Sequence, residues 1–140
     1  MINSEIIKER LKEIDENIKI LSDLKKMSLK SFISDVKTCK AAERCLEVSI
    51  QCVIDICHHI IAARNWPRPK DSREAIITIG QRGIIPLTFS KRIQPMAGLR
   101  NILVHEYIKV DPVIIYKHLR RLADFRKFQK YIIIYLQKHT

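Results

Sequence analysis

The sequence predicts an all-α fold, an up-and-down bundle of about five helices, on three observations. Chain breakers are scarce, because only 3 Gly and 5 Pro are present and most of them lie between Trp66 and Gly98. On either side of that stretch, apolar residues recur at helical spacings. Hydrophobic residues make up 46% of the 140 positions, enough for one core, so we expect a single domain over residues 1–140.

The first two expected helices are long and amphipathic. The first carries an apolar seam with alternating spacings of four and three residues: Ile7, Leu11, Ile14, Ile18 and Leu21. The second is predicted from about Ser31 to about Arg64, because nothing within it interrupts the apolar pattern. Its expected buried stripe is Val36, Cys39, Leu46, Ile50, Val53, Ile54, Cys57 and Ile61. The segment Trp66-Pro67-Arg68-Pro69 then ends it, since a residue that precedes proline avoids helical geometry.

Three further helices follow from start and stop signals. An acidic N-cap with Glu three residues later is a capping box, Gly is a common C-terminal cap, and an N-cap followed by Pro begins a helix. In order, these signals predict a short helix from Asp71–Glu74 to about Gly83, a helical segment from Phe89 to Tyr107 kinked or restarted at Pro95, and a helix that starts at Asp111-Pro112 and carries Val113 to Leu136.

Four cysteines lie within the second expected helix, at spacings of six, seven and five: Cys39, Cys45, Cys52 and Cys57. Such residues are expected to be buried free thiols, which fits a reducing compartment. No CxxC or HxxxH spacing is present, so we expect no metal site and no cofactor. No run approaches the roughly 18 uninterrupted apolar residues of a membrane span, and the N-terminus becomes charged at once. The protein is expected in the cytoplasm, away from membranes.

The net charge of +11 is unevenly distributed. Residues 1–60 hold ten Lys/Arg and ten Asp/Glu, whereas residues 61–140 hold sixteen basic and five acidic residues. A field concentrated in this way attracts polyanions, with nucleic acid as the first candidate. A solvated basic face without a ligand explains the charge equally well.

One segment departs from ordinary amphipathic composition, because Arg100, Asn101, His105 and Tyr107 stand within an otherwise apolar helix. On an ideal helix Asn101 and His105 share one face, while Arg100 and Tyr107 share another about 140° away. One straight helix therefore does not gather all four groups. A symmetric homodimer would, because two copies of the helix facing each other bring both sets into one cleft.

These side chains suit metal-independent cleavage of RNA. Histidine ionises near neutral pH and serves either proton transfer, at the 2′-hydroxyl or at the leaving oxygen. Arginine offers a fixed fork of donors to the phosphate. Asn101 is placed to hold His105 or donate to phosphate, and Tyr107 to stack on a base. A structural interpretation competes, since a lone helical histidine is usually structural and Arg100 has Glu106 as a possible ion-pair partner.

The arrangement Arg100-Asn101-x-x-x-His105-x-Tyr107 resembles the RNxxxHxY form of the R-x4-H-x-Y motif of HepT-like proteins in the HEPN superfamily. The Ala42-Glu43-Arg44 turn, the Asp55 to Ile61 stretch, the short helix after Trp66-Pro67 and the Met96-Ala97-Gly98-Leu99 lead-in are also similar, so the resemblance covers nearly the whole chain.

This resemblance implies a homodimeric helical bundle that is the toxin of a toxin–antitoxin pair, a metal-independent endoribonuclease with its RNA cleft at the dimer interface. Arg100 and His105 would be the catalytic pair, supported by Asn101. The implied partner is a minimal nucleotidyltransferase antitoxin, which would add AMP to Tyr107 and so block the cleft.

Two other functions remain open. The bundle is also compatible with a non-catalytic scaffold or substrate-binding partner of a nucleotidyltransferase, although the intact Arg100 and His105 pair favours the enzyme. A plain basic nucleic-acid-binding bundle explains the charge but leaves the four motif residues without a role. A neighbouring nucleotidyltransferase gene would separate the first two functions from the third.

Overall fold

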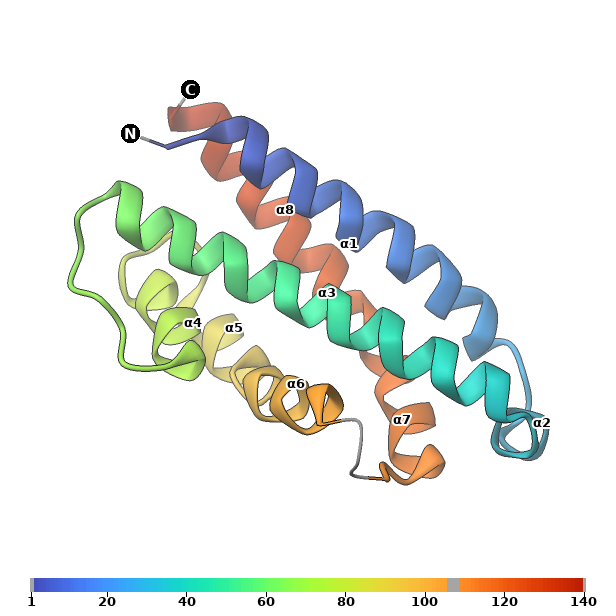
Figure 1. Cartoon of the computed structure of the whole chain (residues 1–140). Coiled ribbons are helices and arrows are strands. Elements are labelled where there is room, and N and C mark those ends of the chain that lie inside the picture. The colour runs from blue at the N-terminus through green and yellow to red at the C-terminus, as the bar shows by residue number, and fades with distance from the viewer. Residues whose placement is uncertain (1, 106–108, 140) are drawn as a thin grey trace.

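The structure, a computed structural model, describes residues 2–105 and 109–139. Over these residues it is helical, with turns and loops between the helices and no strand, which confirms the predicted all-α class (Figure 1). The elements are α1 (Ser4–Lys25), α2 (Leu29–Ser34), α3 (Val36–Ala63), α4 (Ser72–Gln81), α5 (Leu87–Ile93), α6 (Met96–Val104), α7 (Pro112–His118), the 3-10 turn η1 (Leu119–Arg121) and α8 (Leu122–His139).

Helix α3 forms the centre of the bundle. Helix α1 packs along it more extensively than any other pair of described elements, α8 lies beside α1, and α4 and α6 also contact α3 (Figure 1). All five residues of the predicted α1 seam, from Ile7 to Leu21, are buried. By length and composition α3 is apolar enough to cross a membrane, but 61% of its most apolar window is buried inside the bundle, as in the core helix of a soluble protein.

The predicted second helix is in fact two helices, which meet at Asp35. The Asp35 carboxylate accepts hydrogen bonds from the Lys37 N–H (3.1 Å) and the Thr38 hydroxyl (2.9 Å), so it caps the start of α3. An N-cap residue has extended rather than helical backbone, which is why α2 ends where α3 begins. Val36 is consequently 70% exposed, and its place in the predicted buried stripe is wrong. The other members of that stripe are buried.

The remaining helix starts follow the predicted signals. Asp71 accepts a hydrogen bond from the Glu74 N–H (2.8 Å), and Asp111 accepts one from the Val113 N–H (2.9 Å). Gly83 has a φ of 78° just after α4, the left-handed conformation expected of a C-terminal cap. The predicted last helix is not continuous, because the 3-10 turn η1 separates α7 from α8.

The four cysteines are free and buried, as predicted. Burial, with a smaller contribution from the Asp55 carboxylate, raises the pKa of Cys52 to about 11. Burial also raises the pKa of Cys57 above its usual range. A thiol reacts as the thiolate, so these side chains act as small apolar residues of the core rather than as nucleophiles.

Helices α4 and α5 make an unusually close contact at Gly80. A Cβ atom built on Gly80 would lie 2.4 Å from the Cβ of Ser90, so only glycine fits there. The buried Ser90 hydroxyl donates a hydrogen bond to the Ile76 carbonyl (2.9 Å) and ties α5 to α4. Because α6 restarts at Pro95, directly after α5, this contact fixes where α6 begins.

Candidate active site

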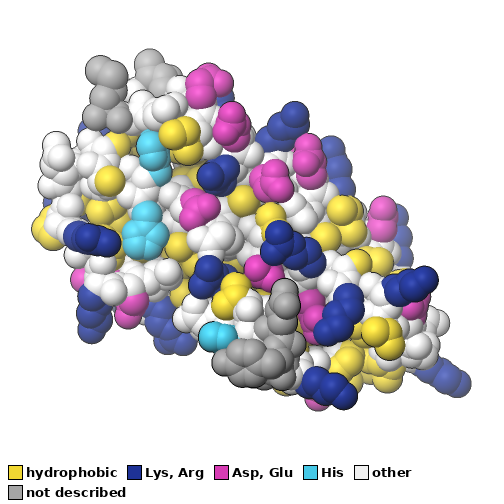
Figure 2. Space-filling model, viewed as in Figure 1, with side chains coloured by type: hydrophobic (Ala, Val, Ile, Leu, Met, Phe, Trp, Pro, Cys, Tyr) yellow, Lys and Arg dark blue, Asp and Glu magenta, His cyan; other side chains and the backbone are white. Residues whose placement is uncertain are grey.

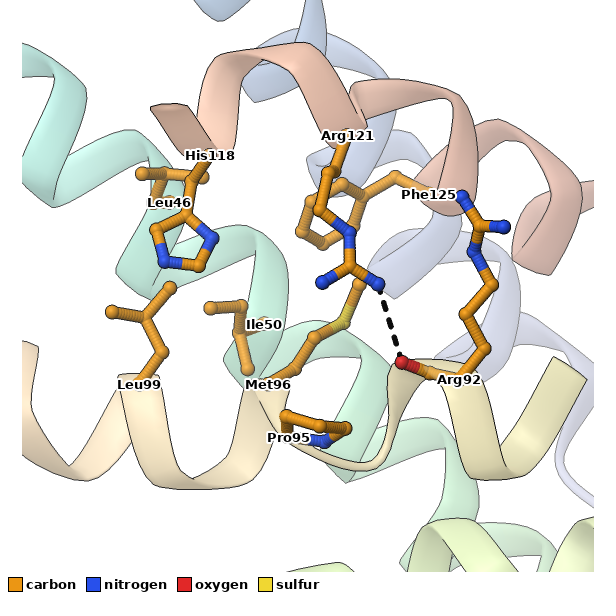
Figure 3. A pocket seen from close by; sticks show the side chains of 9 residues that line it. All are labelled: Leu46, Ile50, Arg92, Pro95, Met96, Leu99, His118, Arg121 and Phe125. Atoms are coloured by element: carbon orange, nitrogen blue, oxygen red, sulfur yellow. Dashed lines mark hydrogen bonds between the residues drawn. The ribbon is translucent and has the colours of Figure 1, made fainter. Parts of the chain in front are cut away.

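Helix α6 carries the first half of the predicted motif. Its inner side faces mostly apolar side chains of neighbouring helices. A hollow of only about 50 Å³ separates α6 from α3 and from the η1–α8 segment, and Leu99, Met96 and His118 point into it (Figure 3). The Arg121 guanidinium donates to the Arg92 carbonyl across this hollow (3.3 Å). The space is too small for a substrate, so it serves to position α6.

Two arginines that line this hollow form ion pairs with one buried carboxylate. Asp124 is 1% exposed and lies 3.1 Å from the Arg92 guanidinium and 3.4 Å from that of Arg121. Arg92 belongs to α5 and Arg121 to η1, so Asp124 joins both segments to α8. Removing charge from water is expensive unless it is paired, and two guanidinium partners supply that pairing. These ion pairs connect α5, η1 and α8 next to the motif helix.

Arg100 and Asn101 lie side by side on α6. Arg100 is half-buried, and its Nη1 donates to the Asn101 Oδ1 at 3.3 Å. Its Nε is buried and meets no hydrogen-bond acceptor among the described residues. A buried donor without an acceptor costs about 1–3 kcal/mol. A phosphate oxygen is the kind of acceptor that would remove this cost.

His105 lies where α6 ends. The sequence predicts helix through Tyr107, but α6 ends at Val104 and His105 is its C-cap, with a non-helical ψ of 85°. The predicted continuation of the helix to His105 is therefore wrong, whereas the face predicted to be shared by Asn101 and His105 stays a prediction. Tyr107 lies outside the described residues, so its predicted place in the site stays a prediction.

A hollow of about 400 Å³ opens beside His105. Its other wall is one face of α3, formed by charged residues at helical spacings of three and four: Lys40, Glu43, Arg44 and Glu47. Lys40 pairs with Glu43 at 3.4 Å, and Arg44 pairs with Glu47 at 3.1 Å. Arg100 and Asn101 are not among the described residues that line this hollow, so the structure does not gather the predicted site residues around one pocket.

The sequence analysis did not predict that this charged face of α3 would lie beside His105. The Ala42-Glu43-Arg44 stretch gave the only signal, through its resemblance to a known family, and in the structure it is one turn within α3. Alternating acidic and basic residues look like an ordinary solvated helix face. Figure 2 shows that pattern, with Lys and Arg side chains interspersed with Asp and Glu over the face made by α1 and α3.

The chain matches known proteins over most of its length. The family model described as ribonuclease HepT-like matches residues 7–132. The tRNA nuclease HepT of Aphanizomenon flos-aquae is 35% identical over 107 residues, which are 76% of this chain and 73% of that protein. The mRNA nuclease HepT of Shewanella oneidensis is 31% identical over 87 residues, 61% of this chain and 62% of that protein.

Solved structures share the fold. The tri-AMPylated Shewanella oneidensis HEPN toxin, in complex with its MNT antitoxin, superposes with a TM-score of 0.83 at 26% identity, covering 92% of this chain and 97% of that one. The cytosolic protein of unknown function YutE from Bacillus subtilis has a TM-score of 0.83 at 16% identity, covering 99% and 93%. The second likeness concerns the fold alone.

Proposed function

The chain belongs to the ribonuclease HepT-like family, and we propose that it is the toxin of a toxin–antitoxin pair, a cytoplasmic endoribonuclease that needs no metal. The observation that carries the proposal is Arg100, half-buried on α6 with a buried Nε that meets no acceptor among the described residues, just ahead of His105 at the end of the same helix. An anion receptor and an imidazole on one short segment are the two groups that cleavage of an RNA phosphodiester requires.

The proposed reaction is an attack by the RNA on itself. An imidazole takes the proton of the 2′-hydroxyl, the 2′-oxygen bonds to phosphorus, and the bond from phosphorus to the 5′-oxygen breaks. The leaving 5′-oxygen receives a proton from a second acid group. The products are a 2′,3′-cyclic phosphate and a 5′-hydroxyl, so neither water nor metal enters the bond-breaking step.

Arg100 acts on the phosphate in this mechanism. As charge develops on the non-bridging oxygens, its guanidinium donates to them, and the buried Nε, which meets no acceptor within residues 2–105 and 109–139, gains one. Asn101, already in contact with Arg100, holds the guanidinium in orientation or donates to the same phosphate. The arginine stays charged when RNA excludes water from the cleft, because the guanidinium does not lose its proton in proteins.

The reaction needs two proton transfers, but each copy of the motif contains only one histidine. This difference favours a homodimer as the active unit. His105 and Arg100 lie in different surroundings within one chain. A two-fold axis close to α6 would bring the two copies of each residue into one cleft, with one copy of His105 as base and the other as acid.

Regulation completes the proposal. Solved neighbours in the same family are toxins bound to an MNT antitoxin, one of them tri-AMPylated. We infer a minimal nucleotidyltransferase antitoxin as partner and Tyr107 as the AMP acceptor. An AMP group two residues after His105 would add bulk and negative charge where the RNA phosphate has to bind.

The decisive experiment incubates the purified protein with tRNA and with mRNA in excess EDTA. Wild type should cleave and leave cyclic phosphate ends. Arg100→Ala and His105→Ala should each lower the rate by about 10²–10⁴, the usual worth of a phosphate-binding donor or a proton-transfer group. The matched controls are His58→Ala and Arg120→Ala, which remove the same side chains away from α6 and should cleave at the wild-type rate.

Three results would contradict the proposal. Activity lost in EDTA and restored by magnesium would exclude the mechanism. Wild-type rates in Arg100→Ala or His105→Ala, with unchanged circular dichroism, would place the site elsewhere. No cleavage of either RNA, together with stable binding to a nucleotidyltransferase, would favour the non-catalytic scaffold.

A further inference from the structure

A second hollow, of about 330 Å³, lies at the end of the bundle away from His105. It opens where the C-terminal ends of α3 and α8 meet the turn that follows α4 (Figure 1). Arg64, Arg82 and Lys138 contribute three cationic groups to its lining, and Trp66 and Tyr131 contribute partly exposed aromatic rings. Its volume falls within the range of small-molecule and nucleotide sites.

No acidic side chain among the described residues neutralises the cations of this hollow. Among the described residues no carboxylate lines it, and none of the three cations is in an ion pair there. Arg64 donates from Nε to the Tyr135 hydroxyl at 2.7 Å, a neutral partner that fixes the guanidinium in place without cancelling its charge. Elsewhere on the surface, by contrast, basic side chains such as Lys40 and Arg44 pair with glutamates.

Two aromatic rings lie beside the cations of this hollow, and each also has a contact within the protein, Trp66 with Arg82 and Tyr131 with Phe89. The Arg82 guanidinium lies over the Trp66 ring, 4.9 Å from its centroid, which holds the indole and the cation in one layer. The Tyr131 ring is partly exposed on the α8 side. Cationic grooves with aromatic faces bind single-stranded nucleic acid, because the cations hold phosphates and each ring can stack on any base.

We propose that this hollow is a second RNA-binding site, which holds a phosphate and base of single-stranded substrate far from the scissile bond. The proposal rests on the ribonuclease function proposed above and adds to it how a long RNA is retained. An acidic protein segment is the rival occupant. The stacking faces favour RNA, because carboxylates would pair with the arginines without needing exposed rings.

The distance between the two sites follows from the length of α3, which reaches both. Glu43 lines the hollow beside His105 and Arg64 lines the second hollow. They are 21 residues apart on one continuous α-helical segment and its C-cap, about 32 Å along the axis at 1.5 Å per residue. A trinucleotide, about 10 Å long when stacked at 3.4 Å per nucleotide, is too short to occupy both. Only longer RNAs should therefore depend on the second site.

The test compares two double charge reversals that change the net charge equally. Arg82→Glu/Lys138→Glu alters the second hollow, and Lys12→Glu/Lys30→Glu alters exposed lysines on α1 and α2. In a His105→Ala background, the affinity for a tRNA transcript is measured by anisotropy over a range of salt. In the wild-type background, cleavage rates are measured for the same tRNA and for a trinucleotide.

The variant Arg82→Glu/Lys138→Glu should weaken tRNA binding about tenfold or more. The slope of log affinity against log salt concentration should become shallower by the equivalent of about two phosphate contacts. The α1–α2 variant should weaken tRNA binding at most about twofold, and both should cleave the trinucleotide at the wild-type rate. Trp66→Ala, which leaves the charge unchanged, should also weaken tRNA binding. Where wild type does not cleave but its tRNA affinity still depends on the second hollow, the catalytic proposal fails and this one stands.

Equal losses in the two double variants would mean diffuse attraction and would overturn the second site. So would unchanged tRNA affinity in Arg82→Glu/Lys138→Glu, whether or not binding to the antitoxin is lost. Either result leaves the EDTA and His105→Ala experiment, and hence the ribonuclease proposal, unaffected.

Discussion

Arg100 and His105 are separated by only four residues in the chain, yet they meet different surroundings. Arg100 contacts Asn101 on the helix, whereas His105 faces the charged wall of α3. Positions five residues apart point about 140° away from each other on a helix, and α6 ends just before His105. At the scale of residues, the site depends on where one helix stops.

His118, which packs against the other side of α6, supplies a pH-dependent test at this scale. Burial, and then the nearby Arg121 guanidinium, lowers its pKa below the usual value of 6.5. The unfolded chain therefore binds a proton at this residue before the folded protein does. Its contribution to stability is present above the unfolded pKa and is lost as the pH falls below that value.

Wild type should consequently lose more free energy of unfolding than His118→Gln when the pH is lowered from about 7.5 to about 5.5, across the histidine range. Urea denaturation at the two pH values measures this difference. Equal losses in wild type and His118→Gln would show that this histidine does not resist protonation.

At the scale of elements, α6 has an inner and an outer side. Leu103 and Ala97 are buried against the bundle, whereas Ile102 is 46% exposed beside the motif. An isoleucine left exposed next to the proposed catalytic residues is expected if a second copy of α6 covers it. Ile20 on α1, at 47%, is an apolar residue of similar exposure that lies on another helix.

Ile102→Glu should therefore convert the proposed homodimer to monomers at micromolar concentration and reduce cleavage by at least about tenfold, because an unpaired carboxylate is costly to bury in an interface. Ile20→Glu introduces the same charge at the same exposure and should change neither. Sedimentation velocity and cleavage assays measure the two properties. A fully active monomer of wild type, or equal effects of the two substitutions, would exclude α6 as the dimer contact.

At the scale of the whole molecule, the distribution of charge bears on the proposed regulation. Residues 61–140 carry the entire excess of basic over acidic residues, and they include the motif and the second hollow. An AMP group on Tyr107 would bring negative charge into this basic half. The antitoxin would thus act on the same electrostatic field that attracts RNA.

Tyr107→Phe removes the acceptor oxygen alone, so it should retain much of the cleavage activity and resist inactivation by the antitoxin. Co-expression of each toxin variant with the antitoxin measures growth, and mass spectrometry of the purified toxin measures AMP addition. Equal protection of cells against wild type and Tyr107→Phe would show that complex formation, rather than modification of Tyr107, masks the toxin.

Local patterns determined most of the helices. The seam from Ile7 to Leu21 is buried as predicted, and the caps at Asp71 and Asp111 start helices where expected. Both signals are local, since burial follows the helical repeat and a cap needs only its next few residues. The family resemblance also came from the sequence, through the spacing of Arg100 and His105.

Only the tertiary structure decided how α6 ends and what faces the motif. No Gly or Pro marks the end of α6, whose last buried residue is Leu103 and which ends at Val104. Tertiary packing supplies most helix stability, so the sequence by itself did not reveal this end. The α3 wall beside His105 and the hollow around Arg64 combine residues far apart in the chain, and the folding of the bundle alone brings them together.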